Sequence, residues 1–144
     1  MAKINPEQLQ QALQKGLSPA YLITGDEPLL VQESCDAIRA AARKAGFSER
    51  EIFHTDAGFQ WPQLLQSANS LSLFADKKLL EVRLHNGKPG DAGTKVLQEY
   101  CAAPAADNLL MLVCPKLDKA SQNSKWYSAI EQIGTVVTIW PIGV

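Results

Sequence analysis

Five short apolar runs divide the sequence, and each of the first four is followed by a segment with the spacing of an amphipathic helix. Strands that alternate with helices predict a parallel sheet with right-handed crossovers and helices on both faces. The run at 108–114 is the most apolar, so we expect it in the middle of the sheet. The pattern predicts a three-layer α/β domain on a five-stranded parallel sheet. The expected strands cover residues 20–24, 51–54, 78–84, 108–114 and 135–139.

The helices between these strands are predicted from apolar spacing and from the residues that begin and end them. For the helix at about 27–45, Asp26 is the expected N-cap and Gly46 the residue that stops it. A Gly/Pro loop over 86–93 is expected to precede a later helix. The predicted helices cover about 5–15, 27–45, 61–68, 96–100 and 121–132.

The composition fits a single globular domain with a core, because 46% of the 144 residues are hydrophobic and 20% are charged. A formal net charge of −1 argues against a protein whose main task is to coat nucleic acid. Cys35, Cys101 and Cys114 form no Cys-x-x-Cys pair, so no metal site is expected. The start has no apolar signal run, and no stretch approaches the ~20 apolar residues of a membrane span. We expect a cytoplasmic protein.

The turn after the first strand lies where a nucleotide-binding relative carries Gly-x-x-x-x-Gly-Lys-Ser/Thr. When the first glycine is aligned on Gly25, the second falls on Leu30. The lysine and the hydroxyl residue fall on Val31 and Gln32, so the cation that meets the outer phosphates and the magnesium ligand are both missing. Pro28 lacks an N–H donor, and two carboxylates bring negative charge to the phosphate position. We expect a non-functional phosphate loop that holds no ATP, formed by Gly25, Asp26, Glu27, Pro28, Leu30, Val31 and Gln32.

Other catalytic constellations are weak. His54 and His85 stand apart from any nucleophile or metal motif, and no Gly-x-Ser-x-Gly sequence occurs. The segments 84–86 and 114–116, which follow two strands, offer no Asp-Glu pair to hold magnesium and orient water. We therefore expect no catalytic residue and no cofactor. A nucleotide-dependent enzyme with an atypical phosphate loop is kept as an alternative.

The segment 67–78 joins a helix to a strand and carries two adjacent large apolar residues, Leu73 and Phe74. Turn-forming residues flank them on both sides. Such residues at a loop tip suit an anchor that fills a pocket on a partner protein. They also suit a role in closing the core under the sheet, and the residue pattern leaves both interpretations open.

Three stretches, in order along the chain, resemble the N-terminal domain of the delta subunit family of bacterial DNA polymerase III. They are residues 21–30 with Glu33, residues 72–74, and residues 116–119 with 125–127. The resemblance implies an AAA+-like domain without ATPase activity, which continues in the family into a helical lid domain and a helical collar. Because the chain stops a few residues after a core strand, we expect 1–144 to be one domain of a longer protein.

The resemblance also implies a partner and the residues that contact it. In the family, the residues at the positions of Leu73 and Phe74 enter an apolar pocket on the sliding clamp. Residues 70–74 match four of the five positions of the clamp-binding pattern Gln-Leu-Ser/Asp-Leu-Phe, with Ser70 in place of the glutamine. The clamp-binding residues implied here are Leu71, Ser72, Leu73 and Phe74.

The role implied for this domain is therefore non-enzymatic. It would be part of the DNA-directed DNA polymerase holoenzyme, a nucleotidyltransferase, and would help to open the clamp for loading onto primed DNA. Other clamp-loader subunits would bind ATP and would join through regions absent here, while contact with primed DNA would be indirect or weak. Direct DNA binding is a further alternative, although short charge runs are usually solvated faces. The local basic runs are Lys77, Lys78, Arg83 and Lys88, or Lys116, Lys119 and Lys125.

Overall fold

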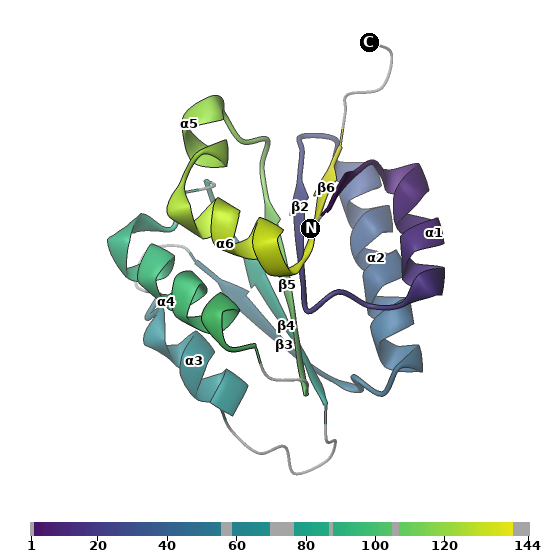
Figure 1. The fold of residues 1–144 in the computed structure, drawn as a ribbon, viewed down its shortest axis with the longest axis horizontal. Helices are drawn as coiled ribbons and strands as arrows, with labels where there is room; N and C mark the ends of the chain where they lie inside the picture. Colours follow the sequence, from purple (N-terminus) through teal and green to yellow (C-terminus); the bar gives the residue numbers. More distant parts are fainter. Residues whose placement is uncertain (1, 56–58, 70–76, 87, 105–106, 140–144) are drawn as a thin grey trace.

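The computed structural model describes residues 2–55, 59–69, 77–86, 88–104 and 107–139. One parallel sheet forms its centre, with the strand order β1-β6-β2-β5-β4-β3 (Figure 1). The five predicted strands are confirmed, and β5 lies inside the sheet between β2 and β4 with every residue buried. The strands are β1 (Ala2–Ile4), β2 (Ala20–Thr24), β3 (Glu49–His54), β4 (Lys78–Arg83), β5 (Asn108–Cys114) and β6 (Thr135–Thr138).

A sixth strand, β1, was not predicted from the sequence. Its three residues pair in parallel with β6, from Ala2 opposite Thr135 to Ile4 opposite Val137. So short a segment has no periodicity of its own, and its pairing depends on the edge that β6 provides.

The helices cover both faces of the sheet, as predicted. In Figure 1, α1 and α2 lie on one side and α3, α4 and α6 on the other. The helices are α1 (Pro6–Lys15), α2 (Pro28–Lys44), α3 (Pro62–Asn69), α4 (Gly90–Ala102), α5 (Lys119–Gln122) and α6 (Lys125–Ile133). Among the described residues, no helix is long and apolar enough to cross a membrane.

Two helix boundaries were predicted wrongly. The helix α4 begins at Gly90, inside the segment expected to be a loop, because the Gly/Pro signal marks only the turn before it. The single helix expected over 121–132 is two helices. Asp118 caps α5 by accepting a hydrogen bond from the Ser121 N–H at 2.7 Å, and Ser124 starts α6. The predicted stop at Gly46 is confirmed, since Gly46 has a φ of 101° and the Phe47 N–H donates back to Ala42 at 2.9 Å.

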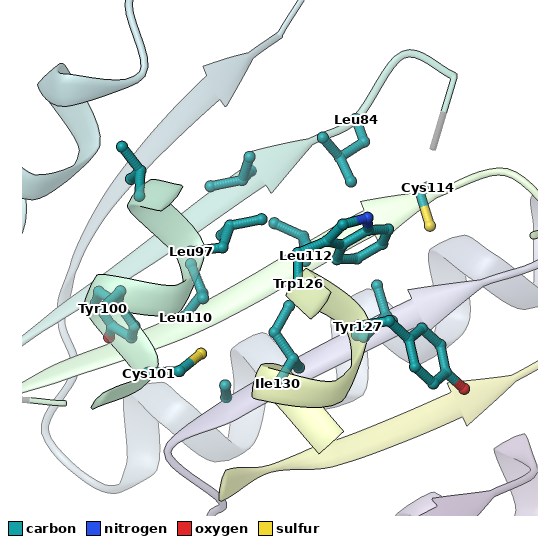
Figure 2. Packing of buried hydrophobic residues seen from close by; sticks show 14 of the residues in the cluster. Leu84, Leu97, Tyr100, Cys101, Leu110, Leu112, Cys114, Trp126, Tyr127 and Ile130 are labelled. Atoms are coloured by element: carbon teal, nitrogen blue, oxygen red, sulfur yellow. The ribbon is translucent and has the colours of Figure 1, made fainter. Parts of the chain in front are cut away.

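Each face of the sheet has its own apolar core. On the side of α1 and α2, Leu9 and Ile38 pack against side chains of β2 and β5. On the other side, Trp126 and Ile130 of α6 lie over β5, and Tyr100 of α4 lies at the end of the core away from Cys114 (Figure 2). Because β5 ends at Cys114, the Tyr100 end of this core is the end at which the strands begin.

Candidate functional site

The turn after β2, which holds the predicted phosphate loop, is closed by the chain itself. The Ile139 N–H donates to the Thr24 carbonyl at 2.9 Å, and the Gly25 N–H donates to the Cys114 carbonyl at 3.4 Å. A Cβ atom built on Gly25 would lie 2.6 Å from the Cβ of Ile139. The space above this turn is thus occupied by the residue that follows β6.

Asp26 does not cap α2, so that prediction is wrong. The N-cap is Glu27, which makes no side-chain cap, and Pro28 occupies the first turn. The Asp26 carboxylate instead accepts a hydrogen bond from the Lys116 N–H at 3.0 Å. The Thr24 hydroxyl donates to the Pro115 carbonyl at 2.8 Å. These bonds tie the turn to the segment after β5, so its polar groups are directed to the chain rather than to a phosphate.

A cavity of about 240 Å³ opens at this carboxyl edge of the sheet, where the strands end. Four predicted loop residues line it, while Leu30 packs on the α1–α2 core and Gln32 is exposed on α2. Arg83 lines the same cavity. The loop residues in the lining are Gly25, Asp26, Pro28 and Val31.

Arg83 is held by a buried carboxylate that the sequence analysis did not single out. Glu81 of β4 has no exposed surface and binds the guanidinium groups of Arg39, Arg50 and Arg83 at 2.7–3.1 Å. Burial by itself raises the pKa of Glu81, but the guanidinium groups, with Arg39 first among them, outweigh it and hold the pKa below its ordinary value of 4.5. The sequence feature that could have revealed these ion pairs is a glutamate, Glu81, in the middle of an apolar strand.

The cysteine side chains offer no reactive thiolate at neutral pH. Burial raises the pKa of Cys35 to about 11 and the pKa values of Cys101 and Cys114 to about 12. All three thiols are buried and are therefore protonated at neutral pH. Among the described residues, no group of three His, Cys, Asp or Glu side chains is placed to hold a metal ion.

The four predicted clamp-binding residues, Leu71 to Phe74, lie outside the described residues, but both flanks of their segment are described. Lys78 is 5% exposed, and its ammonium donates to the Ser67 carbonyl at 3.0 Å. The Asn108 amide donates to the Ala68 carbonyl at 2.6 Å. These donors satisfy two of the last carbonyl groups of α3, which have no partner within the helix.

Lys78 is further held by carboxylates of β3, at 3.2 Å from Glu51 and 3.5 Å from Glu49. The described residues that flank segment 70–76 are therefore fastened to the sheet at its amino edge, where the strands begin. Lys78 was predicted to belong to a basic patch, and no contact was predicted for Asn108.

The first basic patch considered for DNA is largely paired within the chain. Lys78 is buried, Arg83 is bound to Glu81, and the Lys77 ammonium lies 5.2 Å from the centre of the Phe47 ring. Lys78 is therefore unavailable as a surface cation, whereas the Arg83 side chain is 39% exposed and Lys88 is exposed. The second set is exposed and lies after β5, at Lys116, Lys119 and Lys125.

Fold and site together define an α/β domain on a parallel sheet, in which the turn after β2 has no Gly-Lys-Ser/Thr sequence of the kind that nucleotide-binding phosphate loops carry. Residues 21–139 match the family described as DNA polymerase III, delta subunit. The chain therefore belongs to the DNA polymerase III delta subunit family.

Two curated relatives support this membership. The chain is 36% identical over 138 residues to the DNA polymerase III subunit delta of Escherichia coli, and the match covers 96% of this chain. It is 35% identical over 132 residues to the subunit of the same name from Haemophilus influenzae, with 92% of this chain covered. The chain spans 40% and 38% of the lengths of these relatives.

Solved structures share the fold. The DNA clamp loader delta protein of Bacillus subtilis superposes with a TM-score of 0.72 at 19% identity, covering 92% of this chain and 42% of that one. A gamma subunit-related protein of DNA polymerase III from Thermotoga maritima gives a TM-score of 0.58 at 12% identity, covering 96% of this chain and 47% of that one. At these identities the likeness concerns the fold alone.

Proposed function

We propose that this chain is the clamp-binding domain of a clamp loader, which acts in DNA replication without binding or hydrolysing ATP itself. The observation that carries the proposal is the family match over residues 21–139, which includes the Leu-Phe pair. It is supported by a relative of the same fold that is described as a DNA clamp loader delta protein.

The proposed contact residues are Leu71, Ser72, Leu73 and Phe74. Large apolar side chains that fill a partner's pocket supply most of the binding free energy in many interfaces. The bond between Lys78 and the Ser67 carbonyl, which flank this segment, supports the assignment because a contact segment between fixed flanks loses less conformational entropy on binding.

The proposed action on the clamp needs no chemistry by this domain. A protein that binds the opened clamp more tightly than the closed one shifts the population towards the opened form. The closed turn at Gly25 and the pairing of Arg83 with Glu81 support a division of labour, in which other subunits hold ATP.

Three further points belong to the same proposal. Residues 1–144 form one domain of a longer protein, whose lid and collar regions join the other clamp-loader subunits. Contact with primed DNA is indirect or weak. A role in chromosome replication places the protein in the cytoplasm.

Replacing the two anchor side chains tests the contact residues. We expect the double substitution Leu73→Ala and Phe74→Ala to weaken binding of the 144-residue chain to its sliding clamp by about 100-fold or more, since truncated hot-spot residues each cost at least about 2 kcal/mol. Binding is measured by calorimetry or surface plasmon resonance, and folding by circular dichroism.

The matched control is Leu29→Ala, which removes a leucine side chain that is 62% exposed on α2. It should leave clamp affinity unchanged. Equal affinities for the double variant and the unaltered chain would disprove the assignment of Leu73 and Phe74.

The alternatives are distinguished by direct titrations. Magnesium-dependent binding of ATP, measured by calorimetry, would support a nucleotide-dependent enzyme and contradict this proposal. Salt-dependent binding of primed DNA that is lost on replacing Lys116, Lys119 and Lys125 would favour a direct DNA-binding module.

A further inference from the structure

A pocket of about 290 Å³ lies between α3 and α4 at the amino edge of the sheet. Its walls are Leu65 and Ala68 of α3, Tyr100 of α4 and Ala103, which caps that helix. Asn108 lines it from the start of β5. Figure 2 shows Tyr100 at the end of its core, away from Leu84 and Cys114. The pocket is thus at the opposite end of the strands from the phosphate loop.

The hydroxyl of Tyr100 has no hydrogen-bond partner. Tyr100 is 4% exposed, and its hydroxyl oxygen is one of two buried side-chain polar atoms without a partner among the described residues, with that of Ser34. Buried hydroxyl groups are normally paired, so an unpaired one at a pocket needs an explanation. Burial raises the pKa of Tyr100, so the phenol is protonated at neutral pH and can both donate and accept.

The chemistry of the lining selects a cationic occupant. Glu99 is exposed at the pocket and supplies a carboxylate, and no basic side chain is among the described lining residues. The apolar walls at Leu65 and Ala68 suit the methylene stem of a long side chain. A lysine or arginine would place its stem on these walls and its N–H donors near the carboxylate and the phenol oxygen.

The position of the pocket points to the protein that supplies this side chain. Ala68 and Asn69 line the pocket and immediately precede segment 70–76. Asn108, in the same lining, also holds the Ala68 carbonyl at 2.6 Å. Asn69 precedes Leu73 by only four positions in the sequence, so a protein bound at Leu73 and Phe74 has this pocket within a few residues of its contact segment.

We propose that the Tyr100 pocket is a second contact for the sliding clamp and receives a lysine or arginine side chain of that protein. The inference rests on the proposed clamp-binding function. The pocket adds specificity to the apolar anchor, because its buried hydroxyl is paired only when the correct side chain enters.

Two substitutions test the proposal with the 144-residue chain and its sliding clamp. Tyr100→Phe removes only the hydroxyl, and we expect clamp affinity to fall by about three- to tenfold. We expect its thermal unfolding midpoint to stay the same or rise, because the lost hydroxyl had no partner. Glu99→Gln removes the charge, and its affinity loss, about threefold at low salt, should shrink as salt is added.

The matched control is Tyr21→Phe. The Tyr21 hydroxyl accepts a hydrogen bond from the Ser18 N–H at 2.9 Å, and this residue packs in the core on the opposite face of the sheet. Its replacement should lower stability and leave clamp affinity unchanged. A loss of affinity equal to that of Tyr100→Phe would overturn the proposal.

The outcomes separate this inference from the function on which it rests. If the unaltered chain does not bind the clamp, the proposed function and the second contact are both disproved. If the Leu73→Ala, Phe74→Ala variant loses binding while the Tyr100 and Glu99 variants bind like the unaltered chain, only the second contact is disproved. A loss in all of these variants supports both.

Discussion

The carboxyl edge and the amino edge of the sheet differ in where their polar groups find partners. At the carboxyl edge, Asp26 accepts from the Lys116 N–H, and Arg83 is bound to Glu81. At the amino edge, Lys78 fastens the last turn of α3, but the Tyr100 hydroxyl at the neighbouring pocket stays unpaired. The polar groups named at the first edge are paired within the chain, whereas the second edge has a described polar group that another molecule could pair.

In the proposed function, this difference reverses the usual position of a ligand site in such folds. Open parallel sheets bind ligands beyond the carboxyl ends of their strands. Here Ile139 occupies the space above Gly25, and the cation in the nearby cavity is already paired. In the proposed function the framework serves as a support, and the described flanks of the contact segment, Ser67 and Lys78, lie at the edge where the strands begin.

The largest expected effect comes from removing the charge that holds Arg83. We expect Glu81→Gln to lower the free energy of unfolding by about 3–5 kcal/mol, because breaking a buried ion pair leaves guanidinium groups without their carboxylate. Urea denaturation at pH 7 measures this loss. Unchanged stability would mean that the carboxyl edge is not held together in this way.

The same carboxylate predicts a dependence on pH. The pKa of Glu81 is lower in the folded than in the unfolded chain, so its ionised form stabilises the fold. This contribution is complete above the ordinary value of 4.5 and is lost as the pH falls through the lower folded value. Stability between pH 7 and pH 3 should therefore fall more steeply for the unaltered chain than for Glu81→Gln.

A methyl group on Gly25 tests whether the phosphate-loop position is closed. We expect Gly25→Ala to cost about 2–3 kcal/mol, because the new Cβ would lie 2.6 Å from Ile139 Cβ and 2.9 Å from its carbonyl oxygen. Gly16→Ala is the control, since Gly16 has a φ of 145° but nothing within 4 Å of its Cβ position. We expect it to cost about 1 kcal/mol from backbone strain alone. Equal costs would show that the turn is open.

The sequence predicted the framework well because the signals are local. Apolar runs and helix stops such as Gly46 depend on near neighbours, and five strands with β5 inside the sheet follow from them. The absence of the phosphate-binding lysine at Val31 is visible in the residues themselves.

The features that the sequence did not predict depend on contacts between residues far apart in the chain. Asp26 bonds Lys116, 90 positions away, so a local capping rule could not assign its partner. The bond from Asn108 to Ala68 and the pairing of β1 with β6 have no local signal. The unpaired hydroxyl of Tyr100 is known only when every neighbour is placed.

Replacing Lys78 by methionine gives the smallest of these losses and tests the amino edge. Methionine keeps an apolar stem but leaves the Ser67 carbonyl without its donor and Glu51 without its cation. We expect a loss of about 2 kcal/mol in unfolding free energy, below the usual cost of a broken buried pair, because the Glu51 side chain is 40% exposed and water can solvate it. Lys77→Met is the control, and we expect it to cost at most about 0.5 kcal/mol.

Clamp affinity then distinguishes the two edges. Lys78→Met releases the end of α3 directly before segment 70–76, so we expect clamp binding to weaken in conditions where the variant is still folded. Gly25→Ala, although it costs more stability, should leave the affinity of the folded chain unchanged, because its contacts lie at the opposite edge. If both variants, or neither, weaken clamp binding when folded, the assignment of separate roles to the two edges is wrong.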